Sequence, residues 1–584
     1  MFIVPKPKEI KKGNGKLHAK SFKVVSLEVR FFDEFSSSEG ETEIRIHSHD
    51  AELQKEEYKI HVSESGIDVY CGTDEGAFRA YTTLKQIIAQ AENDEIEFLE
   101  IYDKPDFENR GYMLDISRGK IPNLPYLKKL VDILADVKYN QLQLYMQSFV
   151  FEYKSFPEYC KDTEPLTADE IAELEEYCAK KFIQLVPNQN SFGHMAAWTQ
   201  KKEIAPIAIT GKSGKPSATL NPLKEETLEL MDKIYSDVFS VFKADMANIG
   251  MDEPLELGTG ETEDECKKLG TGKVYTEYLN KICRLVSEKY GKTPMFWDDV
   301  VFNHEEVLGD IPKNAVVMHW GYETEHHFDR NCRKLQEHGL RFYVCPGTSM
   351  WVSFTGRMNN AMFNIADAAE CGMYYGAEGF LLTEWGDGGH SQFPAQSYIP
   401  LVFAANVSWN CIRHHHERGF EDRDEAIDLS KKYADKFIYG VTKGSLSDII
   451  FRSGNYYLLE KMLVVNNTIL SGYMRKVSKI NAIDITMTET DKKCYRRIYE
   501  YMLDLKNELK EVCGDTMYIR QAEIGCDIVL LMSKIVTDGK SRETDEEIKR
   551  ISKEFEDLWM EDNRRSGMEI FLKTLNAHMQ EDVI

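Results

Sequence analysis

Two adjacent carboxylates, Asp252 and Glu253, are the residues of this chain best suited to acid–base chemistry. They follow the apolar segment 247–251 directly. In a pair of neighbouring carboxyl groups, like charges push the two pKa values apart, which favours one neutral acid and one anion. An Asp-Glu dipeptide is common by itself. Its place at the end of an apolar strand is what makes it a candidate for proton transfer.

Other polar and aromatic residues also follow the ends of apolar segments. Taken singly, an acidic residue there has about even odds of only capping a helix, and a lone Trp is more often core by roughly two to one. Together, aromatic faces can stack on sugar rings while carboxylates and Arg bind hydroxyls, so the set indicates a carbohydrate site. Hydrolysis of a glycosidic bond uses paired carboxyl groups of this kind. The candidate substrate-binding residues are Arg118, His194, Trp297, Asp298, Trp320, Tyr322, Trp351, Glu384 and Trp385.

The elements that must position these residues alternate between short apolar strands and amphipathic helices over 106–420. About eight such repeats with short links predict an α/β fold, a closed (β/α)8 TIM barrel, whose chemistry lies at the C-terminal ends of the strands. The strands are expected at 111–115, 141–145, 182–187, 247–251, 294–297, 315–320, 341–345 and 379–384. The helices are expected at 124–138, 167–181, 222–242, 275–290, 330–337, 360–369 and 396–412.

Two further domains are expected on either side of the barrel. Residues 1–105 contain alternating strand patterns and one helix, at 74–90, which predicts an N-terminal α+β domain. Residues 421–584 carry apolar residues at helical spacing, which predicts a C-terminal helical domain. Its helices are expected at 458–480, 492–513, 519–536 and 545–559. They form either a packed bundle or the interface of a homodimer.

The composition restricts the partners of the chain. With 72 basic and 97 acidic residues the net charge is −25, which argues against nucleic acid or an anionic membrane as a partner. No apolar run reaches the roughly 20 residues that span a bilayer, and no secretion signal is recognisable. The 12 cysteines form no Cys-x-x-Cys pair, so a cytoplasmic protein with free thiols is expected.

Neither a metal nor a cofactor is expected. The run His414-His415-His416 is predicted to be a solvated helix end, since consecutive helical residues cannot all face one ion. Asn466-Asn467-Thr468 matches a glycosylation acceptor, but without a secretion signal we expect it to be unused.

Two motifs resemble glycoside hydrolase family 20, the β-N-acetylhexosaminidases. The stretch Arg-Gly-Tyr-Met-Leu-Asp-Ile-Ser-Arg at 110–118 resembles the first barrel strand of that family, and Asn-Ile-Gly-Met-Asp-Glu at 248–253 resembles its catalytic fourth strand. The resemblance spans about 106–412, and the N-terminal α+β domain matches the usual partner domain of the family.

The resemblance implies a retaining exo-hydrolase that releases terminal β-linked GlcNAc or GalNAc. The 2-acetamido oxygen of the substrate would attack the anomeric carbon and form an oxazoline. Glu253 would be the general acid and then the general base, while Asp252 would orient the acetamide. The resemblance also implies roles for six other residues. Hydroxyl groups of the sugar would be bound by Arg118, Asp298 and Glu384. The acetamide pocket would be walled by Trp297 and Trp320, and His194 would support Glu253.

Three positions depart from the family pattern. Asn190 stands where the family has Asp, Trp351 where it has a Tyr that donates to the acetamide, and Leu382 where it has a Trp. We hypothesise that the indole N–H of Trp351 replaces the Tyr and that Trp385 compensates for Leu382. Two alternatives stay open: an exo-glycosidase with a carboxylate nucleophile, and a non-catalytic glycan-binding barrel.

Overall fold

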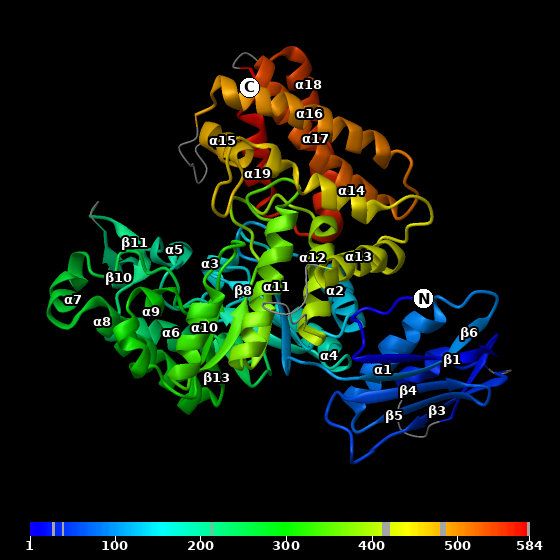
Figure 1. Ribbon diagram of the computed structural model, residues 1–584. Coiled ribbons are helices and arrows are strands. Elements are labelled where there is room, and N and C mark those ends of the chain that lie inside the picture. Colours follow the sequence, from blue (N-terminus) through cyan, green and yellow to red (C-terminus); the bar gives the residue numbers. More distant parts are fainter. Residues whose placement is uncertain (26–29, 38–39, 212–213, 412–420, 479–485, 581–584) are drawn as a thin grey trace.

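The computed structural model describes residues 1–25, 30–37, 40–211, 214–411, 421–478 and 486–580. Three regions follow one another along the chain (Figure 1): a small α/β unit in blue, a central barrel in cyan and green, and a group of helices in yellow to red at the far end. This arrangement confirms the expected fold class. The exact domain boundaries stay a prediction.

The N-terminal region is a six-stranded sheet with one long helix beside it, α1 (Asp74–Ile88). The strand order is β1-β6-β4-β5-β3-β2. Alternate residues of β4 are buried, as the sequence pattern predicts for a sheet covered on one face. The strands are β1 (Glu9–His18), β2 (Phe22–Val25), β3 (Thr42–His47), β4 (Tyr58–Ser63), β5 (Gly66–Cys71) and β6 (Glu95–Asp103).

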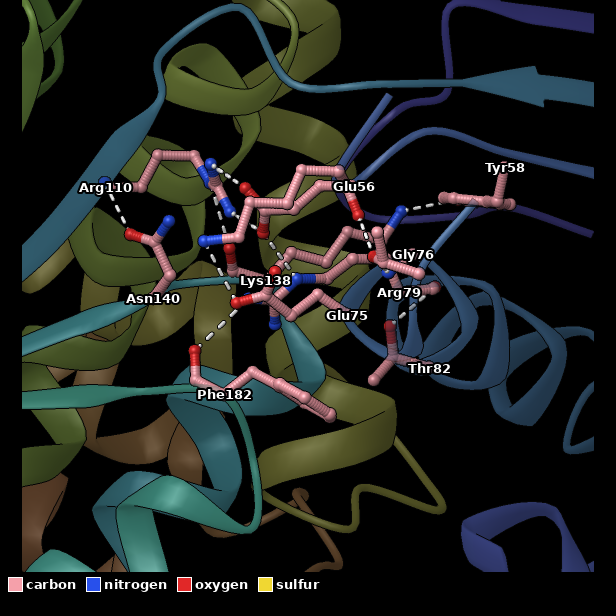
Figure 2. A network of polar contacts seen from close by, with 12 residues as sticks. Glu56, Tyr58, Glu75, Gly76, Arg79, Thr82, Arg110, Lys138, Asn140 and Phe182 are labelled. Atoms are coloured by element: carbon pink, nitrogen blue, oxygen red, sulfur yellow. Dashed lines mark hydrogen bonds and ion pairs between the residues drawn. The ribbon is translucent and has the colours of Figure 1, made fainter. Parts of the chain in front are cut away.

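A buried charge network joins this region to the barrel (Figure 2). The Glu56 carboxylate binds the Arg79 guanidinium at 2.8 Å and that of Arg110 at 2.6 Å. Lys138 Nζ donates to Asp103 Oδ2 at 2.9 Å. Arg110 is the second residue of β7 (Asn109–Asp115), so the N-terminal region meets the barrel at the start of its strands, away from their carboxyl ends.

The central region is a closed parallel barrel in the order β12-β13-β14-β15-β16-β7-β8-β9. Every residue of β8 and β16 is buried, because the barrel interior covers one face and the helices cover the other. Besides β7 the strands are β8 (Gln141–Met146), β9 (Gln184–Gln189), β12 (Met246–Asn248), β13 (Thr293–Trp297), β14 (Val316–Trp320), β15 (Arg341–Cys345) and β16 (Gly379–Glu384). The main surrounding helices are α2 (Leu124–Asp136), α4 (Ala168–Ala179), α6 (Glu225–Phe239), α8 (Thr271–Arg284), α10 (Phe328–Glu337), α11 (Met358–Tyr375) and α12 (Pro394–Trp409).

Two predicted strands have different bounds. The strand expected at 247–251 ends at Asn248, because Gly250 and Met251 have φ of 70° and 81°. The strand expected at 182–187 begins at Gln184, since Phe182 has φ of 55°. Positive φ is incompatible with extended backbone, so both segments leave the sheet at these residues.

The C-terminal region is helical, but the single helix expected at 458–480 is wrong. A short turn of helix, η7 (Tyr456–Leu459), is followed by a non-helical loop before α15 (Ile469–Ser478). The Glu460 carboxylate accepts the backbone N–H of Ile469 at 2.9 Å and that of Leu470 at 3.0 Å. These bonds satisfy the first amides of α15 and therefore fix its start. The other helices are α13 (Glu421–Tyr433), α14 (Leu446–Ser453), α16 (Glu489–Leu509), α17 (Thr516–Asp538), α18 (Arg542–Asp562) and α19 (Met568–Asn576).

Over the described part of the chain, no helix is both long enough and apolar enough to cross a membrane.

Candidate active site

A cavity opens at the carboxyl ends of the barrel strands. It brings together nine of the eleven residues predicted from the sequence and adds two. The lining residues are Arg118, His194, Asp252, Glu253, Trp297, Trp320, Tyr322, Trp351, Trp385, Asp387 and Asn466.

The carboxyl groups of Asp252 and Glu253 both contact the imidazole ring of His194. His194 Nε2 is 3.2 Å from Asp252 Oδ2 and 3.1 Å from Glu253 Oε2. Asp252 is 6% exposed, and its second oxygen, Oδ1, has no hydrogen-bond partner among the described residues. The Glu253 side chain is about half exposed, at 46%. One carboxylate is thus held inside the cavity and the other lies at its opening.

The backbone that presents this pair is strained. Glu253 has φ of 45°, a left-handed conformation that non-glycine residues rarely adopt. Asp299 Oδ2 accepts the Glu253 N–H at 3.1 Å and holds it there. Gly193 allows the loop before His194 to pack closely, because a Cβ at position 193 would lie 2.1 Å from the Asp252 carbonyl oxygen. Residues from three strand ends therefore shape the pair.

Electrostatics favour a charged His194. Burial by itself would lower its pKa, but the charge of Asp252 and the hydrogen bonds to Asp252 and Glu253 outweigh burial and raise the pKa of His194 to about 10. At neutral pH the imidazolium therefore sits between two acidic side chains. Burial, reinforced by the charge of Asp252, also raises the pKa of Asp299 well above its usual range.

Arg118 is fixed between carboxylates and aromatic rings. Its guanidinium lies 3.0 Å from Asp115 Oδ2 and 3.6 Å from Asp387 Oδ2. It also lies over the rings of Tyr145, at 5.2 Å, and Trp385, at 4.8 Å. This geometry holds the fork of N–H donors rigidly at the cavity wall, as recognition of hydroxyl groups requires.

Aromatic side chains form the rest of the wall. Trp320 stacks on Tyr322 with centroids 5.1 Å apart, and Trp351 meets Tyr322 edge-on at the same distance. Trp385 Nε1 donates to the Tyr322 hydroxyl at 2.8 Å, and its ring lies 5.8 Å from that of Trp297. The faces of these rings suit the C–H faces of a sugar ring and an apolar methyl group.

Asp298 and Glu384 do not line the cavity, although both were predicted to contact hydroxyls. Asp298 is 1% exposed and its Oδ2 lies 2.7 Å from His319 Nδ1. Glu384 is 2% exposed, accepts a hydrogen bond from Gln392 at 3.0 Å and lines a separate interior space with Lys120. Asp298 is held by His319, and Glu384 faces a different space, so a direct role of either residue in sugar binding stays a prediction.

The structure also shows the contacts of the three residues that depart from the family pattern. Asn190 donates to the Tyr145 hydroxyl at 2.7 Å and brings no charge to His194. Leu382 is fully buried, while Trp385 lines the cavity. The Trp351 indole N–H already has a partner within the protein, because it donates to Asn466 Oδ1 at 2.8 Å.

Sequence reasoning missed Asp299, Asp387 and Asn466 as parts of the site. Asp387 is three residues beyond Glu384, so the same strand end indicates it. The sequence singled out Asn466 only as part of a glycosylation pattern.

Among the described residues no cluster of His, Cys, Asp and Glu could hold a metal ion. The run His414-His415-His416 lies outside the described residues.

A closed (β/α)8 barrel with an acidic pair, a clamped arginine and a tryptophan wall at its carboxyl rim has the layout of a glycoside hydrolase. Sequence comparison defines the family. The catalytic domain of glycosyl hydrolase family 20 matches residues 107–378, and domain 2 of the same family matches residues 1–104. The chain belongs to glycosyl hydrolase family 20.

Relatives and solved structures agree with this assignment. The chain is 26% identical over 291 residues to a β-hexosaminidase subunit beta of Entamoeba histolytica, covering 45% of this chain and 50% of the relative. The corresponding protein of Felis catus is 27% identical over 320 residues, covering 51% and 58%. The chain thus spans about half the length of the curated relatives it matches.

In structure it resembles a β-N-acetylhexosaminidase from Bacteroides fragilis, with a TM-score of 0.60, 17% identity and coverage of 74% of this chain and 95% of that one. It also resembles a chitobiase from Flavobacterium johnsoniae, with a TM-score of 0.61, 16% identity and coverage of 98% and 99%. At these identities the likeness concerns the fold.

Proposed function

We propose that this protein is an exo-acting, retaining β-N-acetylhexosaminidase that releases terminal β-linked GlcNAc or GalNAc from an oligosaccharide or glycoside. The observation that carries the proposal is the acidic pair of Asp252 and Glu253 around His194, within a cavity walled by tryptophans. Family membership and the names of the relatives support it.

In the proposed reaction the nucleophile belongs to the substrate. The 2-acetamido oxygen attacks the anomeric carbon, and the glycosidic C–O bond breaks as Glu253 gives its proton to the leaving oxygen. Water then opens the oxazoline while Glu253 takes a proton back. The exposed position of Glu253 supports this role, since it must meet both the leaving group and water.

Asp252 is proposed to hold the acetamide. Its Oδ2 is engaged by His194, and its buried Oδ1 has no partner among the described side chains. A buried, unpaired acceptor is costly, so it is suited to an N–H donor that the substrate brings. The acetamide N–H fits, and the negative charge of Asp252 stabilises the positive charge that develops there.

Wild-type kinetics test the proposal. Aryl β-GlcNAc and β-GalNAc should be hydrolysed, aryl β-glucoside should not, and a thiazoline analogue of the oxazoline should inhibit. Turnover of the glucoside without thiazoline inhibition would favour a carboxylate nucleophile. Binding of N-acetylhexosamines without turnover would favour a glycan-binding barrel.

We further propose that the protein works in a reducing compartment such as the cytoplasm, and that its C-terminal helices can pair in a homodimer. Among the described residues the cysteines form no disulfide and all but Cys513 are buried, which supports the first point. Light scattering of the purified protein tests the second. The net charge of −25 supports the absence of a nucleic-acid or membrane partner.

A further inference from the structure

Asn466 enters the active-site cavity from outside the barrel. It lies in the loop before α15, in the C-terminal helical region, and beyond the segment that matches the catalytic domain of the family. The loop reaches the cavity at Trp351, whose indole Nε1 lies 2.8 Å from Asn466 Oδ1. The C-terminal region therefore supplies a polar side chain to a site that the barrel otherwise builds.

The orientation of the Asn466 amide follows from its partner. An indole N–H can only donate, so the atom facing Trp351 must be the amide oxygen. The amide nitrogen, Nδ2, then faces away from Trp351. Among the described residues, the one side-chain hydrogen bond of Asn466 is the bond that its Oδ1 accepts from Trp351, so we infer that the amide nitrogen is left to a ligand in the cavity.

The backbone holds this amide firmly. Asn466 has φ of 52° and sits in a tight turn closed by a β-bridge between Val464 and Asn467. Its own N–H donates to Glu323 Oε1 at 2.6 Å, and Glu323 is paired with Arg357 at 2.8 Å. Asn is one of the few residues besides Gly that tolerate a left-handed turn, so this position combines a permitted conformation with a usable amide.

The other side chains of the cavity indicate which ligand group the Asn466 amide would meet. The charged donors of the cavity, Arg118 and His194, are both engaged by carboxylates. On the Asn466 side, Trp351 packs on Tyr322, which stacks on Trp320. A neutral donor beside apolar rings suits a ligand group with a carbonyl oxygen and a methyl, whose polar and apolar parts both find partners.

We propose that Asn466 is a specificity-determining residue whose Nδ2 donates to the carbonyl oxygen of the 2-acetamido group of the substrate. This rests on the proposed function. Asn466 is then the donor that polarises the acetamide, and Trp351 is the positioning residue that orients it. The earlier hypothesis that the Trp351 indole N–H contacts the substrate is replaced, because that N–H is already bonded to Asn466.

Two matched variants test this role. Asn466→Asp keeps an acceptor for Trp351 and tolerates the turn, but loses the N–H donor. Asn466→Gly keeps the turn and loses the whole amide. For both we expect kcat/KM on aryl β-GlcNAc to fall roughly 10-fold or more, the loss typical of removing one hydrogen bond from a buried site, with an unchanged melting temperature. Wild-type kcat/KM in Asn466→Asp would overturn the proposal.

Calorimetric binding separates this inference from the proposed function. Asn466→Asp should weaken binding of GlcNAc and leave binding of glucose, which lacks the acetamide, unchanged. If the wild type hydrolyses no hexosaminide but Asn466→Asp still weakens GlcNAc binding selectively, the hydrolase function fails and the role of Asn466 stands. Equal weakening for both sugars would show a purely structural role and contradict the inference.

Discussion

The backbone N–H of Glu253 donates to Asp299 Oδ2 at 3.1 Å, which ties the end of one barrel strand to the next. Glu253 has a left-handed φ of 45°, and this hydrogen bond stabilises the strained conformation. Asp299 does not line the cavity. In the proposed reaction Asp299 would therefore act through the position of Glu253.

Replacing Asp299 by Ala should release Glu253 and lower kcat by about 10- to 100-fold, since small misplacements of a catalytic group are costly. Asp299→Asn keeps a carbonyl oxygen that can accept the Glu253 N–H. We expect it to stay close to wild type. The two variants are compared by kcat on aryl β-GlcNAc and by melting temperature. Equal loss in both would contradict the positioning role.

The raised pKa of His194 should be measurable in solution. The acidic pair raises it to about 10, above the 6.5 of a free imidazole. The folded state binds this proton more tightly than the unfolded state, so its contribution to stability is complete below pH 6.5 and is lost as the pH rises through about 10. Titration of the His194 ring by NMR checks this. A midpoint near 6.5 would show that the pair does not hold the proton.

The buried network between the N-terminal region and the barrel should be critical for stability. Burial raises the pKa of Glu56, but Arg110 and Arg79 overcome this effect and lower it to about 2. The stability that Glu56 contributes is therefore present above pH 4.5 and lost as the pH falls through about 2. Glu56→Gln leaves two buried guanidinium groups without a counter-charge, and we expect about 3–5 kcal/mol of destabilisation.

Glu97→Gln is the control for that measurement, because it removes an exposed ion pair with Lys12. Surface pairs contribute little, so its unfolding midpoint in urea should match wild type. Similar midpoints for Glu56→Gln and Glu97→Gln would mean that the network is not a stabilising element.

Trp351 and Asn466 should act as a unit. Trp351→Phe removes the donor that orients the Asn466 amide, and Asn466→Gly removes the amide itself. The double variant should therefore lose little more kcat/KM on aryl β-GlcNAc than Asn466→Gly loses alone. Multiplicative losses would indicate that the two side chains contribute independently.

The barrel was predictable because its strands are buried on both faces and read as short apolar runs. β14 and β16 match their predicted ranges within a residue. The prediction failed where local backbone geometry overrides hydrophobicity. Positive φ at Gly250 and Met251 ends β12 early, and the Glu460 carboxylate caps a helix in the middle of a helical pattern. Neither feature changes the hydrophobic periodicity of the sequence, from which the elements were predicted.

The site was predictable in composition but not in detail. Strand ends indicated the acidic pair and the aromatic wall, but not which of Asp298 and Asp299 would contact the Glu253 backbone. Neighbouring residues at a strand end point in different directions, and here Asp298 turns to His319. Asn466 comes from another region of the chain, and only the tertiary structure brings it to Trp351.

Glu253→Gln tests the central claim, that Glu253 is the only proton carrier, most directly. The measurement is kcat/KM on two GlcNAc glycosides, a disaccharide with a poor leaving group and a dinitrophenyl glycoside with a good one. Because only the poor leaving group depends on proton donation, we predict a loss of roughly 10²- to 10⁴-fold on the disaccharide and a much smaller one on the dinitrophenyl glycoside. Wild-type activity of Glu253→Gln on the disaccharide would contradict the mechanism.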